Sequence, residues 1–561
     1  MFYSFGIIGQ ATAWPIFCVI MAKILYNRKV RKALPHEETN RLMKGAVILS
    51  IAGLFVKILS AAYRVPFQNI VGDVGFYIYQ QVYPIFGIAS MLAVSGFPVV
   101  ISKLVVQKKS KQYADLQAIF LTLMGLGISF SLLLFLGAGI IAGQMGDPLL
   151  KPLIQTIAFI FLLLPFSSMG RGYFQGKGQM VPTAISQMVE QFIRVLAILT
   201  FSFIAVKGGL SLYTVGQGAL ASSLVGSVAS ITCLFIFARK TNVKQLFTNQ
   251  GLTWKHLKKT AKQMIIYGIA ICASGLVLVI FQLIDSFSLY SLLVQSGISE
   301  DMAKELKGVY DRGQPLVQLG AVIAASFSLV LVPLVTQAWE NGEHEEWQQH
   351  TKTALKISAL IGVGAAIGLV NIIRSANSML FASTNGSLVL GVLAIGIIFC
   401  TFILICAAVL QGLGHVFTPV KYVCIGMIIK IILNYFLILH EGILGAAIST
   451  VIALGIVATC LIIEVNKHVD VKDTIREIAI KLSFAAIWMT IVLQLWNIIF
   501  LYLQETRMMD TIQTMVGVGI GAFIYLFVVV RKQLLTEEEM VYIPFGQRLF
   551  RLLEAKKRTR K

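Results

Sequence analysis

The sequence predicts an all-α integral membrane protein with about 14 transmembrane helices, arranged as two pseudo-symmetric six-helix lobes plus two C-terminal helices. Three observations lead to this fold class. Of the 561 residues, 57% are hydrophobic and only 13% are charged, and the mean hydropathy is +0.81, as in helical membrane proteins. The apolar runs continue for about 20 residues, whereas transmembrane β-barrels have short alternating segments. Basic residues gather in alternate loops.

Fourteen apolar runs are long enough to cross about 30 Å of hydrocarbon as helices. They are predicted at 44–63, 76–101, 116–142, 152–170, 182–206, 214–238, 263–293, 312–337, 354–373, 386–410, 417–439, 443–465, 482–503 and 511–530. If the segment before the first helix is cytoplasmic, the inside segments hold 36 of the 47 Lys and Arg residues and the outside segments hold 8. This bias predicts a multi-pass cell-membrane protein whose core begins and ends in the cytoplasm.

The helices divide the chain into five parts. The predicted parts are a membrane-associated N-terminal extension (1–42), an N-lobe (43–239), a C-lobe (240–466), helices 13 and 14 (467–531) and a basic cytoplasmic tail (532–561). The extension is apolar first and basic afterwards, unlike a secretory signal peptide. Whether its first 26 residues cross the membrane is open. The amphipathic tail is expected to lie on anionic lipids.

Two short patterns recur in the two lobes. Gln175–Gly178 and Gln411–Gly414 share a Gln-Gly-x-Gly sequence at an offset of 236, and Tyr77 matches Tyr310 at an offset of 233. Six helices per copy place the two copies in the same orientation. Rocking of such parallel repeats about a shared site is a transporter mechanism.

The charge distribution and the spacing of cysteines and histidines argue against several classes of partner and site. The net charge of +21 comes from loop residues that set orientation, so we expect no nucleic-acid partner. The seven cysteines lie in apolar runs without a C-x-x-C pair, and the histidines have no metal-ligand spacing, so we expect no metal site and no bound cofactor. No phosphate-binding G-x-x-x-x-G-K-[ST] loop is present, so we expect transport to use an ion gradient or the membrane potential.

Cations at the membrane-spanning helices indicate a polar cavity, because a charge at such depth is costly without a partner or water. Lys57 and Arg64 lie seven residues apart, so two helical turns place them on one face. Arg312 opens the eighth helix. Arg binds phosphate bidentately and Lys binds it as a point charge, so these three cations suit a diphosphate. Two alternatives are open: Arg64 anchors at lipid headgroups, or Arg312 pairs with Asp285 or Asp311.

Two further helices carry polar pairs at a spacing of four residues. Glu190 and Arg194 either neutralise each other along one helix face or take part in substrate binding or gating. Lys430 and Asn434 have the same spacing on helix 11. These four residues are candidates for a polar cavity.

The seventh helix carries Gln282 and Asp285 on one face. A carboxylate within a membrane helix is a candidate site for proton or Na⁺ coupling. The sequence leaves the choice of ion open.

Several motifs resemble the polysaccharide-transporter branch of the MOP exporter superfamily, in particular stage V sporulation protein B types and MurJ-like lipid II flippases. They are Tyr63–Pro66, Gly72–Gly75, Arg171–Gly176, Val189–Gln191 and Gln411–Gly414. The resemblance covers about residues 43–530. It implies a bacterial, V-shaped, two-lobed bundle with alternating access.

In MurJ-like flippases, cations on helices 1, 2 and 8 contact a lipid-linked diphosphate. By motif, Lys57, Arg64 and Arg312 fall at or near such positions, whereas Met91–Phe97 on helix 2 carries no cation. The resemblance implies a flippase for an undecaprenyl-diphosphate-linked cell-wall precursor, such as lipid II of peptidoglycan or a related lipid-linked oligosaccharide. A cation-coupled multidrug-type exporter is the alternative, and the short outer loops do not favour an enzyme.

Overall fold

The computed structural model describes residues 37–107, 112–239, 254–500 and 506–534. Within these ranges every regular element is helical and no strand occurs, so the predicted all-α membrane fold is confirmed. The predicted N-terminal extension lies outside the described residues except for its last six, and so do 27 of the 30 residues of the predicted basic tail.

The described residues of the first half of the chain form ten helical elements. They are α3 (Glu37–Ala62), α4 (Arg64–Met91), the π-helix η2 (Leu92–Gly96), α5 (Phe97–Gln107), α6 (Gln112–Gln144), the 3₁₀-helix η3 (Pro148–Leu150), α7 (Lys151–Ala158), α8 (Ile160–Gly176), α9 (Met180–Lys207) and α10 (Leu212–Ala238).

The second half contains longer helices. They are α11 (Trp254–Gln295), α12 (Glu300–Asp311), α13 (Gly313–Glu340), α14 (His344–Phe381), α15 (Ser387–Gly412), α16 (Thr418–Asn466), α17 (Lys472–Phe500) and α18 (Arg507–Arg531).

Eleven stretches of the described residues are long and apolar enough to cross a membrane. Two of them contain a glycine with non-helical backbone: Gly72 (φ 71°) in Ile48–Val105, and Gly442 (φ 57°) in Thr418–Asn466. Each of these stretches therefore contains two of the predicted helices. A helix corresponding to the predicted span 312–337 is present as α13. The total of fourteen crossings stays a prediction.

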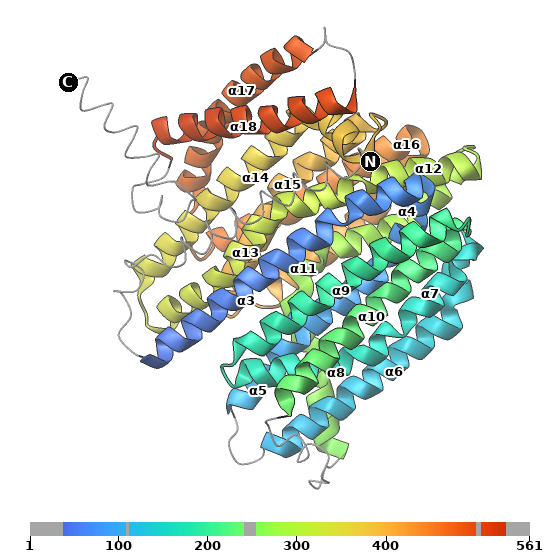
Figure 1. Cartoon of the computed structure of the whole chain (residues 1–561). Coiled ribbons are helices and arrows are strands. Elements are labelled where there is room, and N and C mark those ends of the chain that lie inside the picture. The colour runs from blue at the N-terminus through green and yellow to red at the C-terminus, as the bar shows by residue number, and fades with distance from the viewer. Residues whose placement is uncertain (1–36, 108–111, 240–253, 501–505, 535–561) are drawn as a thin grey trace, which may run out of the picture.

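The helices pack in two groups. In the first half, α9 packs on α3 and α10, and α8 packs on α5, α6 and α10; in the second half, α15 packs on α13, α14 and α16, and α11 packs on α16. The two groups meet where α3 contacts α13 and where α4 contacts α11 and α12. Helices α17 and α18 pack on each other and on α14, at the upper edge of Figure 1.

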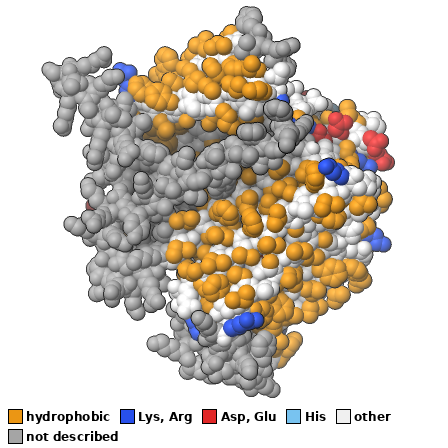
Figure 2. All heavy atoms as spheres, viewed as in Figure 1, with side chains coloured by type: hydrophobic (Ala, Val, Ile, Leu, Met, Phe, Trp, Pro, Cys, Tyr) orange, Lys and Arg blue, Asp and Glu red, His pale blue; other side chains and the backbone are white. Residues whose placement is uncertain are grey.

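The surface shown in Figure 2 is a broad hydrophobic band, with its few Lys and Arg side chains toward the ends. Large apolar side chains such as Phe192, Leu196 and Ile204 on α9 are exposed. A surface of this kind is expected where lipid tails surround a protein, because apolar patches of this extent are rare on soluble proteins.

The repeated Gln-Gly-x-Gly motif forms the same turn in both halves. Gly178 (φ 70°) and Gly414 (φ 86°) both have left-handed backbone just after α8 and α15. The amide of each glycine donates to the carbonyl of the motif's glutamine, at 2.9 Å and 3.1 Å. Glycine takes this conformation without steric cost, which explains why the motif ends both helices. The predicted lobe boundary itself falls beside residues 240–253, outside the described ranges.

Candidate functional site

Arg64 is a fully buried cation without a hydrogen-bonded partner. It is the first residue of α4, directly after Tyr63, and its side chain is 0% exposed. Its Nε, Nη1 and Nη2 atoms form no hydrogen bond with a described residue. The guanidinium carbon lies 4.3 Å from the ring centre of Tyr83. A cation–π contact attracts the charge but leaves the guanidinium N–H donors unused.

Aromatic rings surround this guanidinium. The hydroxyls of Tyr63 and Tyr79 lie 2.9 Å apart, and the ring centres of Tyr79 and Tyr83 lie 5.6 Å apart. Burying a charge without an anionic partner costs several kcal/mol, so the fold holds Arg64 in an unfavourable state in the absence of a ligand. Such an arrangement can accept a phosphate group.

Arg194 on α9 faces the same aromatic wall. Its guanidinium carbon lies 4.6 Å from the ring centre of Phe86 and 5.9 Å from that of Tyr63. Its Nη2 donates to Gln191 at 2.6 Å and to Ser60 at 3.4 Å, and its Nε has no partner. Of the two interpretations of Glu190 and Arg194, the one in which they pair along one helix face is therefore wrong.

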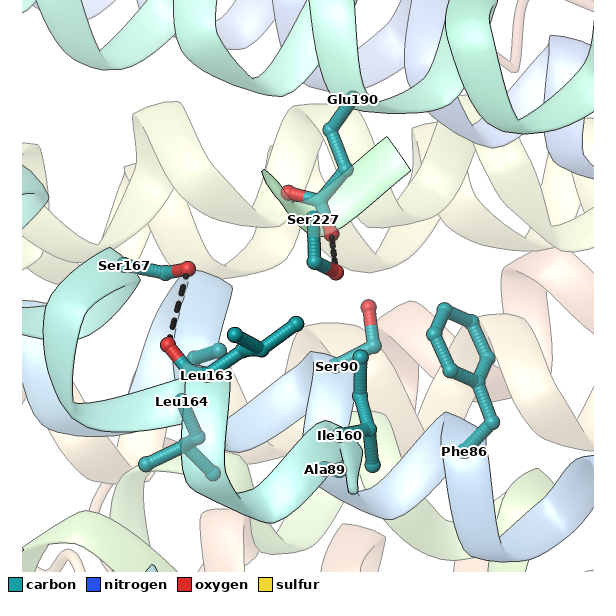
Figure 3. A pocket seen from close by; sticks show the side chains of 10 residues that line it. Phe86, Ala89, Ser90, Ile160, Leu163, Leu164, Ser167, Glu190 and Ser227 are labelled. Atoms are coloured by element: carbon teal, nitrogen blue, oxygen red, sulfur yellow. Dashed lines mark hydrogen bonds between the residues drawn. The ribbon is translucent and has the colours of Figure 1, made fainter. Parts of the chain in front are cut away.

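Glu190 instead pairs with Arg171, a buried residue of α8. Arg171 Nη2 lies 2.5 Å from Glu190 Oε2, and Ser227 donates to Glu190 Oε1 at 3.1 Å. Figure 3 shows Glu190 and Ser227 side by side at a small pocket that Phe86 and Ser90 also line. The Arg171 guanidinium also donates to the carbonyl oxygen of Ala93 in η2, at 3.4 Å. Arg171 therefore connects α8, α9 and the π-helix.

Arg312 links the two helix groups. Its Nε donates to Asp73 Oδ1 at 2.8 Å, and its Nη2 contacts Asp73 Oδ2. Its Nη1 donates to Asn377 at 3.4 Å. Two parallel contacts from one guanidinium to one carboxylate form the strong bidentate geometry. The alternative pairings of Arg312 with Asp285 or Asp311 are wrong.

Those two carboxylates have lysine partners of their own. Asp285 accepts from Lys430 at 2.7 Å, and both oxygens of Asp311 accept from Lys307 at 2.7 Å. Asp311 lies at the end of α12, which is too short to span a membrane. Burial raises the pKa of the Asp311 carboxyl to about 6, and the Lys307 ammonium opposes that rise.

The remaining predicted polar residues lie in the second helix group or at its edge. Asn434 donates to Asp285 Oδ1 at 2.9 Å, and Gln282 donates to Gln314 at 2.8 Å. Lys57 on α3 is half-buried, and no hydrogen bond or ion pair joins it to another described residue. Within the described ranges, no hydrogen bond or ion pair joins Asp285 to Arg64 or Arg194.

Sequence reasoning missed Asp73 and Arg171 as site residues. The predicted fourth helix ended at residue 170, so Arg171 counted as a loop residue, whereas α8 continues to Gly176. Asp73 follows Gly72, whose left-handed backbone redirects the chain. An acidic residue directly after a glycine at a turn was the sequence signal that could have identified Asp73. Among the described residues no group of His, Cys, Asp or Glu side chains can hold a metal ion.

A family model described as "Polysaccharide biosynthesis protein" matches residues 42–339, more than half of the chain. The chain belongs to this family. Within the polysaccharide biosynthesis family and the wider MOP superfamily, it is placed in the branch that includes MurJ-like transporters.

Three relatives come from Bacillus subtilis (strain 168). The uncharacterized membrane protein YabM is 41% identical, over 92% of this chain and 98% of YabM. The lipid II flippase MurJ is 26% identical, over 87% of this chain and 95% of MurJ. Stage V sporulation protein B is 26% identical, over 79% of this chain and 87% of that protein.

Solved structures share the fold. A lipid II flippase MurJ in an inward closed conformation aligns with a TM-score of 0.63 at 17% identity, covering 88% of this chain and 98% of that chain. An inward-facing multidrug resistance MATE family transporter of the MOP superfamily aligns with a TM-score of 0.58 at 15% identity, covering 73% of this chain and 96% of that chain. At these identities the likeness concerns the fold alone.

Proposed function

We propose that the protein is a flippase that moves an undecaprenyl-diphosphate-linked cell-wall precursor of a bacterium from the inner to the outer leaflet by alternating access. The observation that carries this proposal is Arg64, whose guanidinium is buried among tyrosines and has no hydrogen-bond partner for its three nitrogens within the described part of the chain. A diphosphate supplies the acceptor oxygens and the negative charge that this group lacks.

Arg194 strengthens the case for an anionic substrate. Its Nε also lacks a hydrogen-bond partner among the described residues, and its guanidinium faces the rings of Phe86 and Tyr63. Two buried cations on one aromatic wall repel a cationic drug, so a multidrug-type substrate suits this wall less well. The name of one relative, lipid II flippase MurJ, supports a lipid-linked substrate. This function requires no enzymatic step.

The experiment is transbilayer movement of fluorescently labelled lipid II in liposomes that contain the pure protein. A membrane-impermeant quencher reports how fast the label changes leaflet. Arg64→Gln removes the unpaired charge and is expected to slow movement about tenfold or more, because a hydrogen bond to a charged group contributes about 1.5–3 kcal/mol. The matched control is Lys207→Gln, which changes an exposed cation at the last residue of α9. This variant is expected to keep the wild-type rate.

Two results contradict the proposal. If Arg64→Gln moves lipid II at the wild-type rate, Arg64 does not bind the diphosphate. If folded wild-type protein, with ions supplied on both sides, moves neither lipid II nor another undecaprenyl-diphosphate-linked sugar, the substrate class is wrong.

A further inference from the structure

A buried polar cluster in the second helix group contains one carboxylate and one ammonium. Asp285 on α11 is 1% exposed, and Lys430 on α16 is 0% exposed. The Lys430 Nζ atom lies 2.7 Å from Asp285 Oδ1 and 2.7 Å from Thr450 Oγ1. The cluster is therefore neutral in total, and the position beside Asp285 is filled by a side chain of the protein itself.

Both oxygen atoms of the Asp285 carboxylate accept hydrogen bonds. Oδ1 accepts from Lys430 and also from Asn434 Nδ2 at 2.9 Å, and Oδ2 accepts from the Tyr310 hydroxyl at 2.8 Å. Thr450 donates its own proton to the carbonyl of Ala446 at 2.8 Å, so a lone pair of its oxygen faces Lys430. The ammonium thus lies between a carboxylate oxygen and a hydroxyl oxygen.

Such oxygen atoms are the ligands that hard cations prefer. One carboxylate carries one negative charge, so a monovalent cation neutralises it. Asn434 and Ser449, which are hydrogen-bonded to each other beside the carboxylate, offer further oxygen atoms. Without the lysine, this part of the protein would be a buried anion surrounded by oxygen ligands and in need of a cation.

We propose that the Lys430 ammonium is a tethered substitute for an alkali cation, so that this lobe carries a permanent cation and neither needs nor binds Na⁺ at Asp285. Removal of the lysine side chain opens a vacancy that Na⁺ fills. The inference concerns the ion and holds whatever substrate the protein moves. It removes Na⁺ as a candidate ion at Asp285, because a Na⁺ ion and the ammonium cannot occupy one position.

The test is thermal unfolding of the full chain in detergent, followed by the fluorescence of its six tryptophans. Each protein is measured in NaCl and in choline chloride at equal ionic strength. The wild type is expected to unfold at the same midpoint in both salts. Lys430→Ala is expected to have a lower midpoint in choline and to regain several degrees in Na⁺, in a saturable manner, because a ligand that binds the folded state stabilises it by mass action.

Three further variants separate this effect from general salt effects. Lys430→Met fills the vacancy without a charge and is expected to be destabilised equally in both salts. Asp285→Asn/Lys430→Ala removes both charges and is expected to lose the Na⁺ response. Lys481→Ala removes a lysine that pairs with Glu477 outside this cluster, and it is expected to respond as the wild type does.

Three outcomes overturn the proposal. A saturable rise of the wild-type midpoint in Na⁺ would mean that the ion binds despite the lysine. A folded Lys430→Ala protein with equal midpoints in the two salts would mean that the vacancy does not bind Na⁺. If Lys430→Ala aggregates in both salts while Asp285→Asn/Lys430→Ala folds, Na⁺ does not replace the ammonium. None of these readouts depends on lipid transport, so their failure is distinct from failure of the flippase proposal.

Discussion

The buried cations differ in how their charge is balanced. Four of them have a carboxylate partner: Arg171 with Glu190, Lys307 with Asp311, Arg312 with Asp73, and Lys430 with Asp285. Arg64 and Arg194 have none among the described residues. In a membrane protein the unbalanced cations are the ones that need an external anion, which is why Arg64 carries the functional proposal.

The pair Arg171–Glu190 predicts a large change of stability at the residue scale. Glu190→Gln leaves a buried guanidinium without its anion and is expected to lower the free energy of unfolding by about 3–5 kcal/mol. Arg171→Met/Glu190→Leu removes both charges and is expected to recover much of the loss. The measurement is unfolding in mixed detergent micelles as the denaturing detergent is increased.

The control for this prediction is Lys467→Gln. Lys467 pairs with Glu464 at 2.8 Å, but its side chain is 61% exposed, so the change is expected to cost at most about 1 kcal/mol. If Glu190→Gln is as stable as Lys467→Gln, the buried pair contributes no more than a surface pair and the connecting role of Arg171 is wrong.

The sequence predicted which charged residues belong to the site better than it predicted the partners of those residues. A charge inside an apolar run is visible as such, so Arg194, Asp285 and Lys430 were selected, and the structure finds all three buried. The spacing of Glu190 and Arg194 indicated a pair within one helix, but α8 and α10 supply closer partners for Glu190. The spacing of residues along one helix does not predict contacts with other helices.

At the scale of elements, the short helix α12 lies directly on the turn that holds Asp73. A Cβ atom added at Gly308 would lie 2.1 Å from the carbonyl oxygen of Asp73, which is closer than atoms in contact can approach. Lys307, Tyr310 and Asp311 on this helix are buried. The backbone of α12 is therefore part of the contact between the two helix groups.

Gly308→Ala is expected to push α12 away from Asp73 and to lower the midpoint of thermal unfolding by several degrees. Gly125→Ala is the matched control, because Gly125 lies within α6 and has open space where a Cβ would be. Alanine is the better helix former, so the control is expected to be neutral or slightly stabilising. Equal midpoints for the two variants would show that α12 does not need this close contact.

The positions of the spanning helices were predictable because each is a long apolar run. The π-helix η2 was not, because Leu92–Gly96 reads as a continuation of the second helix. Its wide turn depends on neighbours: Arg171 donates to Ala93, and Gly96 lies against Gly268 and Cys272 of α11. The two glycines that interrupt long helices, Gly72 and Gly442, fall between predicted spans and agree with them.

At the scale of the whole molecule, the ion pair Asp73–Arg312 crosses from one helix group to the other. It lies near the end of the bundle that the loop charges predict to be the outer one, and Asn69 donates to the carbonyl of Leu380 on α14 at 2.7 Å across the same boundary. Movement of the two groups apart at this end requires that these contacts break. They hold the structure closed on that side.

Asp73→Asn is therefore expected to open the predicted outer end more often. A reporter cysteine at Ser60, in a chain whose natural cysteines are replaced, is expected to react faster with a membrane-impermeant thiol reagent applied from outside. The exchange Asp73→Arg/Arg312→Asp restores an ion pair and is expected to return labelling toward the slow rate. Unchanged labelling in Asp73→Asn would show that the ion pair does not control access.

The same ion pair has a consequence for how the protein is made. Arg312 is 239 residues further along the chain than Asp73, so the ribosome completes every helix of the first group before Arg312 exists. Arg171 and Glu190, only 19 residues apart, neutralise each other as soon as α8 and α9 have entered the bilayer. Asp73 thus lacks its guanidinium partner until α12 and α13 have been synthesised, and their insertion joins the two halves.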